Sequence, residues 1–512
     1  MRGNNSIKEQ AVFILKKPMF YFCLFFMLVN LVFTKQILDV NNTSGFAIVA
    51  VVETLIELGL ITALYKMKKN NTPLEKMFLL VALVLGVLFI VILPPGQSPD
   101  EVTHFKRVYG ISDGILLPEE IEGMDGRVGS EIPTGTDFLS RDPGHGTYLE
   151  IVNEIDDGVE EKSIQTYTSA ALYSFVCYIP QIIGILIGRL FGFSVLGMSY
   201  LMEIFNFAVW VFLIYYSIKL IPKFKSVVLF ISLLPITIQE ATSLSPDALT
   251  IGLCTFFISY TLYLAYGERK KLERRDYAVV FASSAILGFC KIVYLPLVLL
   301  LLLIPKEKFK TNKNRWLFLG LLFVFIAIIN MAWLVISSRY LVEYRSGVNS
   351  KEQLIGIIQN PFRYLMVIFR SINTHAQLWL NNMLGMNLGA FKFNLPSVLF
   401  YVTFSIMIVL FIQRVECFAY KKIDRWIIAF VFLTIVILIM TSLYMQWTPY
   451  GEDLIDGVQG RYYLPILMLI PLIFCTKKPK RNSLVLVSNG LIIHYGLFIN
   501  IIALVTIFAQ NA

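Results

Sequence analysis

Long apolar runs recur along the whole chain, and they restrict its fold more than any other feature. A helix needs about 20 apolar residues to cross a hydrocarbon core of about 30 Å, and the run Met77–Leu93 is one of many stretches near this length. Lipid offers the backbone no hydrogen-bond partners, so such runs cross a membrane as helices. With 56% apolar and 15% charged residues among 512, the sequence predicts an all-α multipass membrane protein rather than a soluble enzyme.

Short basic segments separate the apolar runs and indicate the topology. Lys and Arg are enriched in cytoplasmic loops, and the basic segments are residues 66–69, 219–225, 268–275, 306–315, 414–425 and 477–481. If the N-terminus is also inside, about 13 transmembrane helices place every one of these segments in the cytoplasm. The spans are expected near residues 20–37, 46–65, 77–94, 196–218, 226–243, 246–267, 277–290, 292–305, 315–337, 396–414, 427–446, 461–475 and 483–508.

Three apolar segments need a separate interpretation. Residues 167–192 are apolar enough to cross the membrane, but counting them as a span would move 219–225 outside. We therefore expect amphipathic helices there that lie in or dip into the outer leaflet. The segments 277–290 and 292–305 are short for full crossings, so a broken or re-entrant pair is an alternative at that point.

This topology divides the chain into four parts. Residues 1–75 form an N-terminal pair of spans, and residues 76–94 form a span that leads to the candidate site. Residues 95–195 form a large acidic extracytoplasmic loop with interfacial helices. The remaining transmembrane bundle covers residues 196–512 and has an outer loop at 445–460.

The net charge of +9 hides a strong segregation of charge. Residues 100–162 hold 16 acidic and 5 basic side chains, so the basic excess lies elsewhere, in short connections. A nucleic-acid-binding face is instead a concentrated basic patch, and we expect no nucleic acid partner. The six cysteines are scattered singly, without the spacing of a metal or redox motif.

The segment Pro94–Arg107 is the strongest candidate for a functional site. It follows the run 77–93 directly and contains the adjacent acids Asp100 and Glu101, and ionisable residues at a membrane boundary are functional candidates by default. A structural alternative is a helix start with Ser98 as cap, Pro99 as first helical residue and Glu101 in a capping box.

The helix that would follow carries a second feature. Asp100, His104 and Arg107 share one face of it at helical spacing. A carboxylate with an imidazole one turn away suits general-base work on a hydroxyl. It suits metal coordination equally, so the cofactor stays open and a divalent cation is one option.

Further polar residues are expected at the same outer surface. Glu240 and Asp247 flank the sequence Ser243–Pro246, and Lys291 stands alone among apolar neighbours with Tyr294 nearby. Arg461 follows an acidic loop. Each has a structural alternative, for example Asp247 as a helix cap or Arg461 as an interfacial anchor, but their convergence on one side favours a site.

These residues suggest a division of roles. Acids could activate a hydroxyl, and cations could hold a phosphate leaving group as charge develops on it. The predicted catalytic residues are Asp100, Glu101 and Asp247. The predicted substrate or phosphate contacts are His104, Arg107, Lys291, Tyr294 and Arg461. Glu53 and Glu57, one turn apart in the predicted span 46–65, receive no role beyond pairing with a neighbouring helix.

Three motifs carry a resemblance to a known family. Pro99–Arg107 with Gly110–Ser112 looks like one signature of the bacterial membrane-protein family called domain of unknown function 2142. Gly457–Pro465 looks like its second signature, and Ser243–Asp247 is similar to a shorter third. The resemblance covers roughly residues 75–475. The arrangement of outer acids, membrane-associated loop helices and many spans also resembles the GT-C superfamily of glycosyltransferases.

The superfamily resemblance implies a mechanism. It implies a sugar donor linked to a polyprenyl phosphate, used on the extracytoplasmic face, with a carboxylate site that needs a metal in some branches. Carried over by position, Asp100 would be the catalytic base and Asp247 the acid of the second loop. Phosphate contacts at Lys291 and Arg461 rest on the predicted topology. The spans before residue 77 are absent from the simplest superfamily layout, so they inherit no role.

Three functions are weighed. The leading hypothesis is a glycosyltransferase in a bacterial plasma membrane that moves a sugar from a polyprenyl phosphate to a cell-wall or surface polysaccharide or a lipid-linked glycan, with inversion at the anomeric carbon. A surface-polysaccharide polymerase or ligase is the second, although such enzymes are expected to use basic residues in a late loop. The third is a polysaccharide or lipid transporter, which predicts charges along a path at the midplane. The sugar, the acceptor and the oligomeric state are not indicated.

Overall fold

Helices dominate the computed structural model. It describes residues 18–38, 43–124, 126–134, 136, 139, 144, 147–154, 161–340, 346–413, 418, 421–474 and 487–512. Within them, seven helices are long and apolar enough to cross a membrane, namely those at 45–69, 74–92, 195–220, 247–266, 312–340, 422–446 and 489–511. These helices support the prediction of a mainly helical membrane protein, and the number of 13 spans stays a prediction. The basic segment 477–481 and half of 414–425 lie outside the described residues.

The long helices match predicted spans closely in their bounds. They are α2 (Pro18–Ile37), α3 (Thr43–Lys69), α4 (Leu74–Ile92), α8 (Val195–Leu220), α11 (Asp247–Tyr266), α12 (Arg274–Cys290), α13 (Asn312–Ser337), α16 (Val398–Ile412), α17 (Lys422–Gln446) and α19 (Asn489–Asn511). Both α11 and α19 are buried over most of their length, so they form the centre of the bundle.

Three predicted spans are not continuous α-helices, and proline is present in each. Residues 226–243 form α9 (Lys225–Ser232) and α10 (Pro235–Ala241), because Pro235 cannot continue the hydrogen bonds of the preceding helix. Residues 292–305 form the 3₁₀ helix η4 (Ile292–Leu303), which contains Pro296. The third, 461–475, consists of η8 (Gly460–Ile466), with Pro465 inside it, and α18 (Leu469–Phe474).

The segment after α4 contains a small sheet that the sequence did not predict. It begins with α5 (Glu101–Ser112) and includes α6 (Thr147–Glu154). Strands β1 (Glu119–Glu120), β2 (Val128–Pro133) and β3 (Lys162–Thr166) pair antiparallel in the order β1-β2-β3, with Gly129 opposite Thr166. The sequence predicts helices in this loop but not these strands, because the short segments lack the long apolar runs that marked the spans.

Residues 167–192 do not form one membrane-length helix. They fold as the 3₁₀ turns η2 (Thr168–Leu172) and η3 (Phe175–Tyr178), followed by α7 (Ile179–Leu190). At about 1.5 Å per residue α7 is about 18 Å long, which is too short to cross the hydrocarbon core. Whether α7 dips into the outer leaflet stays a prediction.

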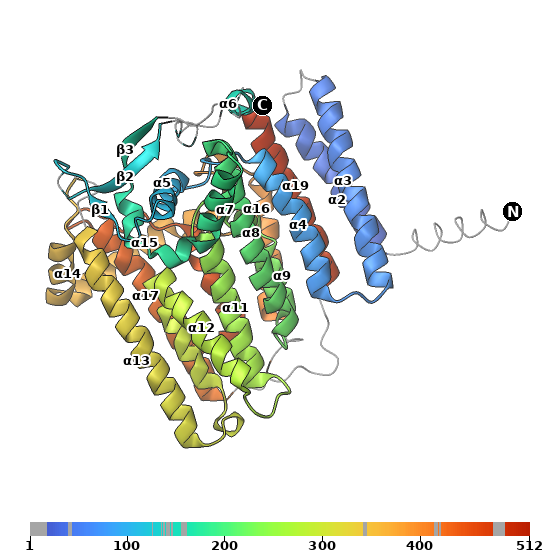
Figure 1. Cartoon of the computed structure of the whole chain (residues 1–512). Coiled ribbons are helices and arrows are strands. Elements are labelled where there is room, and N and C mark those ends of the chain that lie inside the picture. The colour runs from blue at the N-terminus through green and yellow to red at the C-terminus, as the bar shows by residue number, and fades with distance from the viewer. Residues whose placement is uncertain are drawn as a thin grey trace.

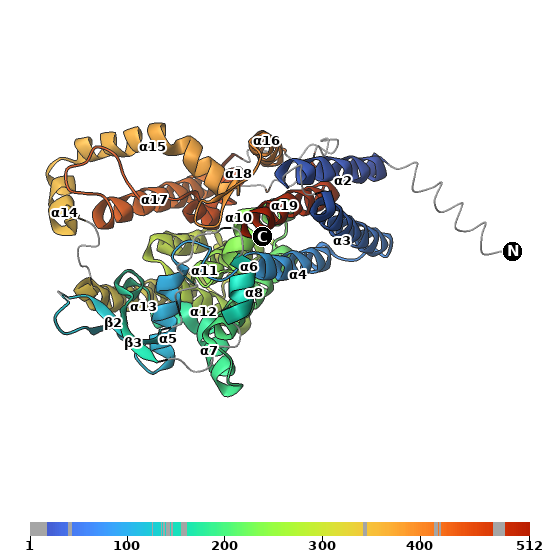
Figure 2. The same ribbon diagram turned by 90° about the horizontal axis from the view of Figure 1, so that it is seen from above.

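The two ends of the helix bundle contain different elements (Figure 1). The α3–α4 and α11–α12 connections lie at the lower end in that view, and the sheet and α5 lie at the upper end. The helices α14 (Ser350–Gln359) and α15 (Pro361–Met383) lie at the upper end, and α15 runs across the long helices instead of along them (Figure 2). The remaining short elements are η5 (Lys306–Lys308), η6 (Ser338–Tyr340) and the hairpin β4 (Asn387–Leu388) and β5 (Phe393–Asn394).

Candidate active site

The first motif places Asp100 at the start of α5 in an uncommon backbone conformation. Asp100 is the cap residue, with φ of +67° in the left-handed region, where Asp is tolerated better than most residues. Its carboxylate makes no capping hydrogen bond, and its side chain is 58% exposed. The predicted start, with Ser98 as cap and Pro99 as first helical residue, is wrong by two residues because the left-handed turn at Asp100 delays the helix to Glu101.

Glu101 is buried and joins two motifs that are far apart in the sequence. Its Oε2 accepts hydrogen bonds from the backbone N–H groups of Gly96 and Ser98, at 2.8 and 2.9 Å, and its Oε1 accepts one from Leu244 at 2.8 Å. Burial raises the pKa of the carboxyl, and these three donors oppose the shift. With both oxygens occupied and the residue 1% exposed, Glu101 does not fit the predicted catalytic role and is a positioning residue.

The turn 243–246 between α10 and α11 fixes the position of Asp247. The buried side-chain amides of Gln181 in α7 and Asn206 in α8 donate to carbonyl oxygens of this turn. The cap of α11 is Pro246, so Asp247 is the first helical residue and not the cap. The carboxylate of Asp247 is thereby available for contacts outside its own helix.

Two glycines allow the late motif to approach its neighbours. Gly457 has φ of +77°, which side chains other than glycine rarely adopt. A Cβ atom at Gly460 would collide with the backbone carbonyl of Trp379 in α15. Glycine at 460 therefore lets η8 lie directly against α15, and the next residue, Arg461, reaches the interior.

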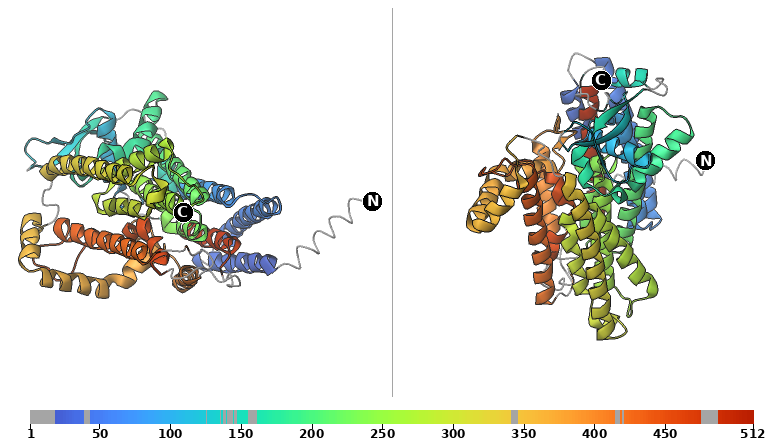
Figure 3. Two further views of the ribbon diagram at one scale, coloured as in Figure 1. Left: turned by 90° about the horizontal axis from the view of Figure 1, so that it is seen from below. Right: turned by 60° about the vertical axis from the view of Figure 1, so that its left-hand side comes forward.

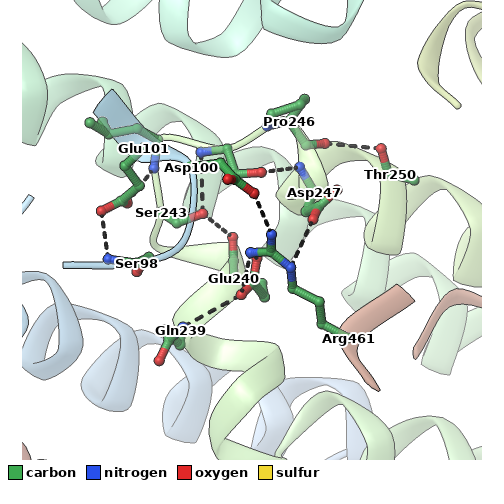
Figure 4. A network of polar contacts seen from close by, with 12 residues as sticks. Ser98, Asp100, Glu101, Gln239, Glu240, Ser243, Pro246, Asp247, Thr250 and Arg461 are labelled. Carbon is green, nitrogen blue, oxygen red and sulfur yellow. Dashed lines mark hydrogen bonds and ion pairs between the residues drawn. The ribbon is translucent and has the colours of Figure 1, made fainter. Parts of the chain in front are cut away.

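Arg461 lies among three carboxylates (Figure 4). Its Nη2 donates to Asp100 Oδ2 at 2.8 Å, its Nη1 donates to both Glu240 oxygens at 3.2 and 3.3 Å, and its Nε is 3.8 Å from Asp247 Oδ2. The arginine side chain is 4% exposed and that of Glu240 is fully buried. Arg461 therefore holds the carboxylates in place through Nη1 and Nη2, and the predicted phosphate contact stays a prediction.

Lys291 completes this group, which we call the Arg461 cluster (Asp100, Glu240, Asp247, Lys291 and Arg461). It lies at the junction of α12 and η4, and its Nζ is 2.5 Å from Asp247 Oδ1. The ammonium faces the rings of Tyr173 and Tyr462, at 5.5 and 5.1 Å from their centroids. Tyr294 fixes this arrangement by donating its hydroxyl to the carbonyl of Tyr462 at 2.8 Å.

A cavity of about 280 Å³ adjoins Lys291. Lys291, Tyr294 and Tyr462 contribute to its lining together with apolar side chains of α13 and α17, among them Leu334 and Leu443. A cavity that combines one ammonium group with mostly apolar walls suits an amphiphile with an anionic head. The cavity therefore connects the Arg461 cluster to the sides of two long apolar helices.

His104 lies next to the cluster as a neutral imidazole. Its Nδ1 is 2.8 Å from the Tyr178 hydroxyl, and its ring meets Tyr173 edge to face. The pKa of His104 is lowered from 6.5 to about 4, mainly by burial; Asp100 and Asp247 oppose this shift, and Lys291 and Arg461 add to it. At neutral pH this side chain offers one hydrogen-bond donor and one acceptor.

The structure does not bring Arg107 into the cluster. Its guanidinium donates to the carbonyls of Ile115 and Leu116, at 3.0 and 2.7 Å, and lies over the Tyr167 ring. The residue is fully buried, and burial lowers its pKa. The predicted substrate contact is replaced by a structural role, because the segment after α5 folds back over this side chain.

The carboxylates do not form an open set of ligands for a resident metal ion. Asp100, Glu240 and Asp247 surround the guanidinium of Arg461, where a cation already balances their charge. Among the described residues, no group of three or more His, Cys, Asp or Glu side chains could hold a metal ion. The donor set therefore does not fit a divalent cofactor.

The structure also adds residues to the predicted site. Glu240 stood beside the third motif in the sequence, and Tyr462 directly follows Arg461, so both could have been included from their positions. Tyr173 and Gln181 carry no local signal, because each reaches the site only when the loop helices fold against α8 and α12. Acids and cations from four separate segments meet here, as the predicted convergence required.

A match between the chain and a known family covers most of its length. The model of the family described as "Predicted membrane protein (DUF2142)" matches residues 83–470. This range contains the three motifs and every member of the Arg461 cluster. No curated protein and no solved structure matches the chain.

Proposed function

We propose that this chain, which belongs to the DUF2142 family of predicted membrane proteins, is a glycosyltransferase of the GT-C type that acts at the outer face of a bacterial plasma membrane. Its donor is a sugar linked to a polyprenyl phosphate, and its acceptor is a hydroxyl of a cell-wall or surface polysaccharide or of a lipid-linked glycan. The proposal rests on two members of the Arg461 cluster: Asp100, whose carboxylate is accessible, and Lys291, which lies beside an apolar cavity.

The accessible acid carries the proposal. Asp100 is 58% exposed, whereas the side chains of Glu240 and Asp247 are 0% and 8% exposed. The left-handed backbone at Asp100 and the hydrogen bond from Arg461 fix the direction of its carboxylate. Uncommon backbone conformations persist where their surroundings over-determine them, and they concentrate at active sites.

The second element is the place for the leaving group. Lys291 faces the cavity that α13 and α17 line with apolar side chains. A phosphate at Lys291 would gain a charge-assisted contact, and an attached isoprenoid chain would lie against the apolar wall. A lipid-linked donor reaches a site at the end of the long helices from the membrane itself. Such a donor needs no soluble nucleotide-binding domain.

The proposed reaction balances within these groups. The carboxylate of Asp100 accepts the proton of the acceptor hydroxyl as that oxygen forms a bond to the anomeric carbon. The bond between this carbon and the phosphate oxygen breaks, and the phosphate leaves with the electron pair toward Lys291. Substitution at one centre inverts the anomeric configuration. Arg461, Glu240 and Glu101 hold the reacting groups without touching substrate.

The test compares the sugar composition of surface polysaccharide in a deletion strain that carries wild type, Asp100→Asn or Asp453→Asn at equal membrane levels. Asn keeps the tolerance for the left-handed conformation, so the first variant removes only the charge. Asp453 is a matched control, because it is also 58% exposed and is bound to an arginine, Arg370, at 2.9 Å.

We expect wild type and Asp453→Asn to restore a missing sugar and Asp100→Asn to fail, since a general base contributes about 10²- to 10⁴-fold to the rate. Equal restoration by Asp100→Asn would overturn the proposed mechanism. A deletion that leaves the composition unchanged but stops export of intact polysaccharide would favour a transporter. A change in chain length at constant composition would favour a polymerase or ligase.

A further inference from the structure

The helices α14 and α15 form an arm that differs from the spans in composition and direction. At 23 residues, α15 is long enough to cross a membrane, yet it is not among the helices apolar enough to do so. It packs against α17 and is seen at nearly full length from above (Figure 2), while α17 runs down the page in the right-hand view of Figure 3.

Three faces can be distinguished on α15. One face is buried and packs Tyr364, Val367 and Ile368 against α17. A second face is apolar and exposed, and it consists of Phe362, Leu365, Met366, Phe369 and Ile372, which are 40 to 81% exposed. A third, polar edge carries Arg363 and Arg370 and continues to Gln377 and Asn381.

The contacts of the arm fix its depth along the bundle. The Tyr364 hydroxyl is 2.7 Å from Thr441 Oγ1, and Gln353 of α14 donates to the carbonyls of Tyr444 and Thr448. Thr441 lies five residues before the end of α17 at Gln446, which is about 7.5 Å at 1.5 Å per residue. Amphipathic interfacial helices bury their apolar face about 5–10 Å into the boundary of headgroups and acyl chains.

Apolar residues are also exposed on the span that the arm packs against, for example Leu433 and Ile437 in α17. Exposed apolar patches rimmed by polar residues mark contact sites, and the rim here carries Arg363 and Arg370, which form ion pairs with Asp453 at 3.5 and 2.9 Å.

We infer that α14 and α15 lie in the outer leaflet as a lipid-seated interfacial arm, with the stripe at Phe369 in the acyl region and the edge of Arg363 and Arg370 at headgroup level. This inference concerns a partner surface and does not depend on the proposed transferase activity. The occupant is the lipid leaflet itself, bound by apolar contact with the exposed stripe.

Spin labelling of the full chain in phosphatidylcholine–phosphatidylglycerol vesicles tests the inference. Phe369→Cys and Gln377→Cys, made where the six native cysteines are replaced by alanine, each receive a nitroxide. We expect the label at 369 to collide several-fold more with dissolved oxygen than with a water-soluble nickel chelate, and the label at 377 to show the reverse. Equal accessibility at both sites would overturn the inference. Protection of 369 from both reagents would also overturn it, since a protein would then cover the stripe.

A second measurement uses the unaltered chain, in case the cysteine-free variant does not fold. A lipid-soluble diazirine activated in the same vesicles should modify Phe362, Met366 and Phe369 and leave Gln377 and Asn381 unmodified, as read by peptide mass spectrometry. Labelling of the polar edge equal to that of the stripe would contradict the arm's position. Neither outcome bears on sugar transfer, so failure here is distinguishable from failure of the proposed function.

Discussion

The Arg461 cluster and the acid pair Glu53 and Glu57 are two buried acidic groups of different design. In the cluster, three carboxylates contact two cations, and one acid remains open to solvent. In the acid pair, Glu53 accepts a hydrogen bond from Thr34 of α2 at 2.7 Å, and Glu57 accepts one from Asn30. Among the described residues, no basic side chain forms an ion pair with either member of the pair.

This difference separates a candidate site from a structural contact. The acid pair joins α3 to α2 through neutral partners, as the sequence suggested, and lies outside residues 83–470 that the family shares. A buried carboxyl is therefore insufficient evidence for chemistry in this molecule. An accessible acid that is oriented by a buried cation is the stronger indication.

Removal of the central cation should have the largest effect. Arg461→Ala leaves Glu240 buried without its partner, and loss of one member of a buried pair costs about 3–5 kcal/mol of unfolding free energy. Chemical denaturation in detergent micelles measures this loss. The double variant Arg461→Ala with Glu240→Ala should recover part of it. If the double variant is as unstable as the sum of the two single ones, the two side chains are not coupled as the structure indicates.

The response of stability to acid should come in part from His104, which lies next to the Arg461 cluster. The pKa of His104 is lowered from 6.5 to about 4, so between these values the folded state binds fewer protons than the unfolded state. Stability therefore falls as the pH drops through this window. Glu101, with a raised pKa, acts in the opposite direction.

The measurement is the midpoint temperature of thermal unfolding of wild type and of His104→Gln, taken at several pH values from 7.5 to 4. Glutamine keeps a partner for Tyr178 but does not titrate. We expect a flatter pH profile for the variant. Parallel profiles would show that His104 is not held neutral in the folded protein.

Substitution of the exposed acid should change stability only through the backbone. Asp100→Ala places a residue without a polar side chain at φ of +67°, which costs about 1–2 kcal/mol. Asp100→Asn should change the unfolding free energy by about 0–1 kcal/mol, because an exposed ion pair contributes little. Chemical denaturation of both variants in the same micelles checks that Asp100→Ala loses more unfolding free energy than Asp100→Asn. Equal destabilisation by the two substitutions would assign the effect to charge instead of to the left-handed turn.

The acid pair should respond least. Glu53→Gln and Glu57→Gln keep an acceptor for Thr34 and Asn30, so we expect changes of about 0.5–1.5 kcal/mol or less, the net value of one hydrogen bond. Unfolding and polysaccharide composition are measured on the same variants. A loss of function without a loss of stability would contradict the distinction between the two acidic groups, since it would give a carboxyl of α3 a role in activity.

The structure brings some of the predicted site residues together and not others. Asp100, Asp247, Lys291 and Arg461 meet as predicted, because isolated charges in apolar sequence stand out and their convergence follows from the topology. Glu101 was assigned a catalytic role and Arg107 a substrate contact, because helical spacing cannot show that one binds three backbone N–H groups and the other binds two carbonyls. The small sheet β1-β2-β3 was missed for a related reason, because the pairing of β2 with β3 joins residues 29 to 37 positions apart.

The sequence alone determined that this chain is a helical membrane protein, where its long helices begin and end, and which motifs carry the family resemblance. Apolar length and local turn chemistry act within about 20 residues, so they can be read along the chain. Only the tertiary structure decided that Arg461 contacts three carboxylates, that three expected spans are not continuous α-helices and that α15 runs across the direction of the long helices. These outcomes depend on contacts such as Arg461 with Asp100, 361 residues apart, which no local pattern encodes.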